Sequence, residues 1–152
     1  MEIGKYLSDR GVDFESHEHP PAYTAQEVAA AEHVSGKIMA KAVLLRDDAG
    51  YVMCVLSASH KLDLTKVADI RQSNQIRLAD ENELAEMFPD VEVGAEPPFG
   101  NLYDMPMLVD AHLADHDEIV FQAGSHRRTI RMKFADYASL VQPQVEDLAV
   151  IL

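Results

Sequence analysis

Two apolar segments, residues 37–46 and 51–58, flank a short polar turn in the first half of the chain. The intervening residues 47–50 read Asp-Asp-Ala-Gly, a composition typical of a tight turn between antiparallel strands. The second segment has few polar residues, and Cys54 within it is expected to be a buried, unreactive thiol. The pair therefore predicts a central β-hairpin around which the rest of the chain is arranged.

Shorter helices and strands are predicted on both sides of this hairpin, with no repeat or flexible linker. Thr24 and Asp80 each have a Glu three residues later, the spacing of a helix-capping box, and predict helices that end near residues 33 and 88. Further helices are predicted over residues 1–10, 64–70 and 134–141, and further strands over residues 12–17, 75–78, 106–110, 118–123 and 128–133. This order predicts one α/β (α+β) domain, residues 1–152, with a mixed sheet rather than a doubly wound parallel one.

The charge balance limits the partners. The chain has 13 Lys and Arg against 26 Asp and Glu, a net charge of −13, which disfavours general binding to nucleic-acid backbones. There is no apolar run of membrane-spanning length, no signal-peptide pattern, and no second cysteine for a disulfide. We therefore expect a cytoplasmic globular protein with no DNA or membrane partner.

One stretch departs from this acidic average. No acidic residue lies between Glu118 and Asp136, whereas Arg127, Arg131 and Lys133 alternate onto one face of the strand predicted there. We refer to these three residues as the basic stripe. It is suited to local contacts with phosphates, or else it is a solvated face of the sheet.

Lys41 is unusual because it shares a strand face with Met39, Val43 and Leu45. A lysine in this setting either extends its ammonium group to solvent at a sheet edge or lines a pocket that needs a positive charge. Taken alone, the residue favours the edge position.

Residues 94–100, Gly-Ala-Glu-Pro-Pro-Phe-Gly, predict a stiff loop. Gly94 permits backbone angles that other residues avoid, while Pro97 and Pro98 restrict the chain and donate no N–H. Such a loop is able to present the N–H groups of Gly94 and Ala95 to an anion or a developing oxyanion. The alternative is a plain turn between a helix and a strand.

A second turn, residues 123–128, joins two predicted strands and contains Gly124, Ser125 and His126. Turns at strand ends are frequent positions for site residues. A hairpin turn with an exposed histidine is the alternative, and the residues alone favour it.

Metal and covalent catalysis are both disfavoured. Two histidine pairs, at positions 17 and 19 and at positions 112 and 116, have spacings compatible with metal binding. Neither pair has a third candidate ligand at a sequence spacing typical of a metal site. Ser57 and Ser59 lie close to His60 but lack the glycines of a nucleophile elbow. No nucleotide-binding glycine motif is present. We expect no metal and no cofactor.

Five motifs follow one another along nearly the whole chain. They are residues 19–27 (His-Pro-Pro-Ala-Tyr-Thr-Ala-Gln-Glu), 41–45 (Lys-Ala-Val-Leu-Leu), 62–64 (Leu-Asp-Leu), 93–100 (Val-Gly-Ala-Glu-Pro-Pro-Phe-Gly) and 121–126 (Phe-Gln-Ala-Gly-Ser-His). In this order they resemble the YbaK/prolyl-tRNA synthetase-associated domain family. The resemblance implies a compact mixed sheet, curved toward a barrel, with helices packed around it.

The resemblance also implies an activity. Its freestanding members act in trans, hydrolysing the ester that links a wrong amino acid to the acceptor end of tRNA. The implied substrate is above all tRNA for proline that carries a small amino acid such as alanine or cysteine, and prolyl-tRNA synthetase is an implied partner. A binding or regulatory module that keeps the pocket without hydrolysis is the main alternative, and a hydrolase of small free esters or amides is a third.

The resemblance also implies roles for individual residues of this chain that match the family's motifs. Lys41 matches the family's key lysine, which is expected near the terminal adenosine and the scissile ester. Gly94 and Pro98 match its GxxxP motif, whose backbone, together with Ala95, is expected to hold the carbonyl as the tetrahedral intermediate forms. His126 matches a histidine that lines the amino-acid pocket and selects by size.

The remaining assignments concern the surroundings of these residues. Gly124 and Ser125 are expected beside the substrate, and the basic stripe is a candidate tRNA contact. Many relatives differ from this chain at Ala42, Glu96 and Pro97, positions that bear on amino-acid specificity. An aminoacyl ester is already activated, so a positioned water, an oxyanion hole and the ribose hydroxyl of the substrate are sufficient. Lys41 is assigned an electrostatic and positioning role, because a pKa of about 10.4 would not suit a base.

Overall fold

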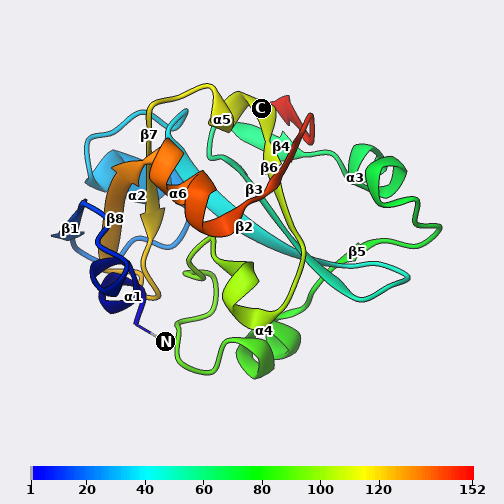
Figure 1. Cartoon of the computed structure of the whole chain (residues 1–152), viewed down its shortest axis with the longest axis horizontal. Helices are drawn as coiled ribbons and strands as arrows, with labels where there is room; N and C mark the ends of the chain where they lie inside the picture. The colour runs from blue at the N-terminus through cyan, green and yellow to red at the C-terminus, as the bar shows by residue number, and fades with distance from the viewer. Residues whose placement is uncertain (1) are drawn as a thin grey trace.

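The predicted hairpin forms the centre of the sheet (Figure 1). In the computed structural model, which describes residues 2–152, β2 (Met39–Arg46) and β3 (Tyr51–Ser57) pair antiparallel along their whole length. The Asp47 carboxylate closes the turn between them by accepting the N–H groups of Ala49 and Gly50. A polar side chain that satisfies backbone donors in this way stabilises a turn.

Eight further strands accompany the hairpin: β1 (Phe14–Glu18), β4 (His60–Leu62), β5 (Arg77–Leu78), β6 (Met107–Asp110), β7 (Glu118–Gln122), β8 (Arg128–Lys133), β9 (Gln144–Glu146) and β10 (Ala149–Ile151). The main sheet has eight strands in the order β1-β8-β7-β2-β3-β6-β9, with β5 paired to β2, and β10 and β4 form a separate pair. β7 is parallel to β2, β6 to β3, and β9 to β6. The prediction of a mixed sheet in an α/β domain is therefore confirmed. β2, which contains Lys41, is a central strand.

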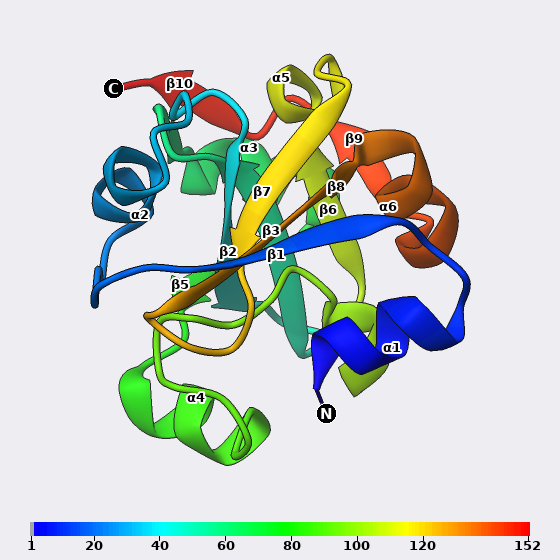
Figure 2. The same ribbon diagram turned by 90° about the vertical axis from the view of Figure 1, so that its left-hand side faces the viewer.

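In residues 2–152, six α-helices and one short 3₁₀ helix surround the sheet: α1 (Ile3–Asp9), α2 (Ala25–Ala31), α3 (Leu64–Arg71), α4 (Glu81–Met87), η1 (Gly100–Tyr103), α5 (Ala111–Ala114) and α6 (Phe134–Val141). Both predicted caps form. Thr24 accepts the N–H of Glu27, and Asp80 and Glu83 make a reciprocal capping box. α1 and α6 pack on one face of the sheet, whereas α2 and α3 pack on the other (Figure 2).

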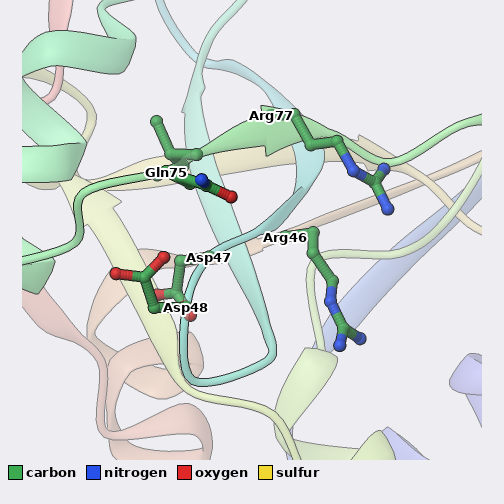
Figure 3. A pocket seen from close by; sticks show the side chains of 6 residues that line it. Arg46, Asp47, Asp48, Gln75 and Arg77 are labelled. Atoms are coloured by element: carbon green, nitrogen blue, oxygen red, sulfur yellow. The ribbon is translucent and has the colours of Figure 1, made fainter.

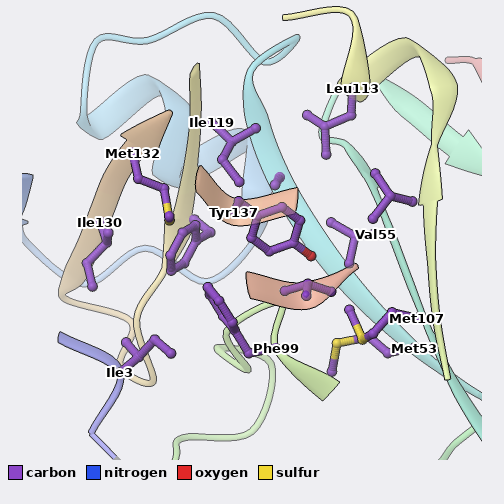
Figure 4. Packing of buried hydrophobic residues seen from close by; sticks show 14 of the residues in the cluster. Ile3, Met53, Val55, Phe99, Met107, Leu113, Ile119, Ile130, Met132 and Tyr137 are labelled. Atoms are coloured by element: carbon purple, nitrogen blue, oxygen red, sulfur yellow. The ribbon is translucent and has the colours of Figure 1, made fainter. Parts of the chain in front are cut away.

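The main core cluster lies between the sheet and α1 and α6, and it also fixes the loop that follows α4 (Figure 4). The Phe99 ring packs edge-on against Tyr137 of α6 and Phe121 of β7, with ring centroids 5.2 and 5.6 Å apart. The Tyr137 hydroxyl is buried and donates to the Pro98 carbonyl at 2.6 Å. A buried hydroxyl needs such a partner, so the 94–100 loop is anchored to the core through Pro98 and Phe99.

The differences from the expected elements are small. The sequence missed β4, β9, β10 and α5, each three or four residues long, because a periodic pattern cannot be recognised over so few positions. Cys54 is buried as expected, and burial raises the pKa of its thiol to about 12. None of the helices in residues 2–152 is long and apolar enough to cross a membrane.

Replacing Tyr137 by Phe should lower the free energy of unfolding by about 1–3 kcal/mol, because the buried Pro98 carbonyl loses its donor. Urea denaturation measures this change. Tyr103→Phe is the matched control, since its hydroxyl lies 3.4 Å from Asp90 at an exposed position, and a change within about 0.5 kcal/mol is expected there. Equal effects of the two substitutions would contradict the anchoring role of Tyr137.

Candidate active site

Lys41 lines a small pocket of about 110 Å³ between β2 and the 94–100 loop. The other polar residues that line it are Tyr23, Glu96 and Gln122. The Lys41 ammonium group is half-buried and donates to the His60 carbonyl at 2.7 Å. Burial lowers the pKa of Lys41, because taking a charge out of water disfavours the charged form. β2 lies in the middle of the sheet order, but its pairing with β7 is limited to Met39 and Ala40, so the β2 backbone at Lys41 is paired with β3 alone.

The loop itself is shaped by Gly94, which has φ +92° and lies against His126. A Cβ at position 94 would be 3.4 Å from Cε1 of His126, in a backbone conformation that other residues avoid. The backbone angle therefore favours glycine at position 94, and a Cβ there would be in van der Waals contact with His126.

The N–H groups of this loop are mostly occupied. The Gly94 N–H donates to Oε1 of Glu96 and the Ala95 N–H to the Glu92 carbonyl, each at 3.0 Å. These are the two donors expected to hold an oxyanion, and the structure uses both within the loop. Pro97 and Pro98 have no N–H, and the Glu96 N–H donates to no acceptor in residues 2–152. The Glu96 N–H is therefore a donor on the pocket-lining part of the loop that no described protein group uses.

The turn between β7 and β8 holds the loop in place through backbone hydrogen bonds. Gly124 donates to the Ala95 carbonyl and accepts from the Glu92 N–H, both at 2.9 Å. Gly124 has φ +88°, and a Cβ there would lie 3.3 Å from Val91. The turn and the loop thus pair like two short strands, which explains how segments about thirty residues apart form one wall.

His126 lies behind that wall rather than on the pocket surface. Its Nε2 is 2.9 Å from the Val93 carbonyl, and its Nδ1 is 3.1 Å from the Gln122 side chain. A carbonyl only accepts, so Nε2 carries a proton. The ring is covered by Tyr23 at a centroid distance of 4.8 Å and is 8% exposed. The geometry suits a residue that positions the Gly94 loop.

The other predicted site residues are less close to the Lys41 pocket. Pro98 is buried, and its carbonyl is bound to Tyr137. Gly124 and Ser125 line a separate hollow of about 300 Å³ beside Pro97. Of the predicted set, therefore, Lys41 and Gly94 share a pocket, Ala95 and His126 support its wall, and Pro98 anchors it from behind.

The three residues of the basic stripe differ in whether a carboxylate compensates their charge. The Arg131 guanidinium donates to both oxygens of the Glu118 carboxylate at 3.2 Å, so much of its charge is compensated. Arg127 and Lys133 are exposed, and neither forms a side-chain ion pair within the described part of the chain. Arg127 directly follows His126, so the uncompensated part of the stripe begins next to the wall of the pocket.

Three pocket residues were not predicted from the sequence. Gln122 is the polar end of an otherwise apolar strand segment and lies four residues before His126. A polar residue at that position could have indicated a site residue. Tyr23 is 63% exposed at the pocket despite being aromatic. Glu96 was noted only as a departure from the family pattern.

A larger hollow of about 520 Å³ lies away from these residues, where β2 meets β5 (Figure 3). Arg46 and Arg77 extend from the paired strands on one side of it, and Asp47 and Asp48 lie on the other. Arg77 is bound to Glu83, and Asp47 is bound to Arg71. Its charges are largely paired, and none of the predicted site residues lines it.

A group with metal-ligand chemistry also lies elsewhere. Ligand atoms of Asp110, His112 and Asp147 are within 4.8 Å of one another. Each carboxylate already binds protein donors, since Asp110 accepts from Leu148 and contacts His112, while Asp147 is paired with Lys66. These contacts join α5 to the C-terminal strands, and we assign no metal to them.

Comparison with known proteins gives a consistent result. The profile of the aminoacyl-tRNA editing domain family matches residues 19–140. The multifunctional Ser/Thr-tRNA deacylase ProXp-y of Escherichia coli (strain K12) is 28% identical over 144 residues, covering 91% of this chain and 86% of that protein. The prolyl-tRNA editing protein ProX of Acetoanaerobium sticklandii is 23% identical over 142 residues, covering 90% and 86%.

Solved structures share the fold. One described as a candidate trans-editing enzyme for prolyl-tRNA synthetase has a TM-score of 0.87 at 24% identity, covering 98% of this chain and 95% of that one. Another, of a hypothetical protein, has a TM-score of 0.88 at 20% identity, covering 99% and 100%. At these identities the likeness establishes the architecture.

Replacing Lys41 by Met should preserve or raise the melting temperature at pH 7, because burial opposes the charged ammonium group. The pKa of Lys41 in the folded protein is below its ordinary value of 10.5, so the unfolded chain binds more protons as the pH rises toward that value. The wild-type protein should then gain stability relative to the variant. Melting curves at pH 7 and pH 10 measure the difference, with exposed Lys61→Met as the control. A variant that is less stable than wild type at pH 7, with a difference that narrows at pH 10, would contradict this account.

Proposed function

The chain belongs to the aminoacyl-tRNA editing domain family, and we propose that it is a trans-editing deacylase, a hydrolase that cleaves the ester of mischarged aminoacyl-tRNA. The observation that supports this most strongly is the pocket in which a half-buried ammonium group, that of Lys41, lies opposite the loop that starts at Gly94. The two curated relatives are named as a deacylase and an editing protein. Each of them aligns with this chain over 86% of its own length.

The chemistry follows from what the pocket offers. An ester carbonyl placed between the Lys41 ammonium and the Glu96 N–H would develop negative charge in a site with a positive charge and an unused donor. Charge stabilisation of this kind usually contributes most to acyl-transfer catalysis. A water molecule, activated with help from the neighbouring ribose hydroxyl of the substrate, would attack the carbonyl carbon. The proton would pass to the departing ribose oxygen, so no protein nucleophile is needed.

The size of the pocket favours a small amino acid. A volume of about 110 Å³, walled by Ala40, Ala42 and Val43 as well as by polar groups, has room for a side chain such as that of alanine, serine or cysteine. We propose tRNA for proline carrying alanine or cysteine as the substrate. Synthetases select poorly against amino acids smaller than their own. Serine is an equally small candidate, since one relative is named a Ser/Thr-tRNA deacylase.

The tRNA is proposed to bind with its acceptor end at the pocket and its phosphates near the basic stripe, with Arg127 and Lys133 contributing most because they lack ion pairs. With a net charge of −13, binding should be weak and sensitive to salt. Delivery of the tRNA by prolyl-tRNA synthetase would offset that repulsion. Since charged tRNA is used in the cytoplasm, we propose that the protein acts there.

A binding module without hydrolysis is the second candidate. It is favoured by one observation, that the Gly94 and Ala95 N–H groups are already bonded within the loop. Measuring binding and turnover separately distinguishes the two functions. A protein that binds alanyl-tRNA(Pro) but releases alanine no faster than the buffer would be a binding module.

Replacing Lys41 by Met should reduce the deacylation rate of alanyl-tRNA(Pro) by at least about 100-fold, because one of two charge-stabilising groups is removed. Release of radiolabelled alanine measures the rate, and Lys61→Met is again the control. A Lys41→Met protein with full activity would show that Lys41 supports the fold and not the reaction.

The double substitution Arg127→Gln and Lys133→Gln should lower kcat/KM for aminoacyl-tRNA and flatten its dependence on salt. The slope against log salt should fall by about one for each phosphate that the protein no longer neutralises. A small alanyl ester should react at an unchanged rate, and Arg131→Gln should have less effect because Glu118 already binds that side chain.

The control for this variant removes equal charge elsewhere, through Arg46→Gln and Lys66→Gln at the β2–β5 and α3 end of the molecule (Figure 1). Equal losses in the stripe variant and the control would assign the effect to overall charge. Equal losses on tRNA and on the small ester would mean that the stripe supports the pocket itself.

A further inference from the structure

Glu96 is an acidic side chain on the wall of the Lys41 pocket, and nothing in the mechanism above uses its carboxylate. The residue is 8% exposed, far less than is usual for glutamate. The residue lines the same pocket as Lys41, Tyr23 and Gln122.

The two oxygens of this carboxylate have different surroundings. Oε1 accepts the Gly94 N–H at 3.0 Å, which fixes the side chain relative to the loop. Oε2 accepts no hydrogen bond from residues 2–152, and it is not among the fully enclosed polar atoms that lack a partner. Oε2 is therefore accessible and without a protein donor in this part of the chain.

No protein cation compensates Glu96. In the described part of the chain, no Lys, Arg or His nitrogen forms a salt bridge with it. The one cation on the same wall, Lys41, donates to the His60 carbonyl instead. A carboxylate withdrawn from water without a cationic partner is costly, so its presence on a pocket wall suggests a ligand that brings the positive charge.

The proposed substrate has one positive charge near its reacting atoms. This is the α-ammonium group, which is attached to the carbon next to the ester carbonyl. We propose that Glu96 binds the α-ammonium group of the aminoacyl ester through Oε2, so that the pocket recognises a free amino acid ester rather than a neutral acyl ester. The assignment rests on the proposed deacylase function.

The arrangement also orients the ester. The Glu96 N–H is an unused donor in the described part of the loop, and the Glu96 carboxylate belongs to the same residue. Binding the α-ammonium group with the side chain would bring the adjacent carbonyl oxygen toward that N–H and the Lys41 ammonium. Discrimination would arise because an acyl group without the ammonium leaves the buried carboxylate uncompensated.

The test compares alanyl-tRNA with lactyl-tRNA, in which a hydroxyl group replaces the α-ammonium group at nearly the same size. Wild-type protein should prefer the alanyl ester, after correction for the spontaneous hydrolysis of each. Glu96→Gln keeps an acceptor for the Gly94 N–H but removes the charge. It should reduce kcat/KM for alanyl-tRNA by about 10- to 100-fold, the range of one charge-assisted hydrogen bond, and change that for lactyl-tRNA by less than about threefold.

The matched control is Glu86→Gln, an equal charge change at an exposed position of α4; it should leave the preference unaltered. Equal losses on both esters in Glu96→Gln would overturn the proposal and indicate a general base or a structural role. An unchanged alanyl rate would overturn it as well. Melting curves identify any loss that results from unfolding.

Failure of the deacylase function would be visible separately, as wild-type protein that hydrolyses neither ester. The inference is then tested by calorimetry with the amide-linked analogue 3′-alanylamino-3′-deoxyadenosine and its lactyl counterpart. Tighter binding of the alanyl compound that depends on Glu96 supports the proposal, and equal binding or no binding contradicts it.

Discussion

The site depends on the pairing of two backbone segments, residues 92–95 and the turn at Gly124. Their two hydrogen bonds of 2.9 Å, together with the contact between His126 and the Val93 carbonyl, hold the 94–100 loop against the end of β7. Since β7 is the parallel neighbour of β2, this pairing places the loop opposite Lys41. Both glycines have positive φ angles and close neighbours, so the pairing tolerates little else at either position. Without it, Lys41 would lie on an open face of the sheet.

The pocket is lined by two charged residues that are partly or almost fully withdrawn from solvent. Lys41 is half-buried, Glu96 is almost fully buried, and neither forms an ion pair with a protein group in the part of the chain that the structure describes. Burial opposes the charged form of Lys41, and sites that bind charged substrates commonly accept such a cost in stability. An aminoacyl ester would bring a cation to Glu96 and a polarisable carbonyl to Lys41. The rest of the molecule supplies the stability through its apolar core, in which Phe99 and Tyr137 also fix the loop from behind.

The sequence predicted the elements with distinct local signals. The hairpin was evident from its turn, and α2 and α4 were evident from their caps, because both signals need only four residues. The position of Lys41 was not decided by its own neighbours: β2 becomes a central strand through pairing with β7, about eighty residues later in the chain. The occupied N–H groups of Gly94 and Ala95 could not be foreseen either, since they depend on a left-handed backbone at Gly94 and on the direction of the Glu96 side chain. Sequence order and resemblance identified the loop, and only the fold shows which of its donors is available.

The most direct measurement is a crystal structure with 3′-alanylamino-3′-deoxyadenosine, an analogue that hydrolysis cannot destroy. The account predicts that its carbonyl lies between the Lys41 ammonium and the Glu96 N–H, within hydrogen-bond distance of both, and that the methyl group of alanine points into the pocket of about 110 Å³. The analogue found in the hollow beside Arg46 and Arg77, or bound with its carbonyl away from Lys41, would contradict the assignment of this pocket as the active site.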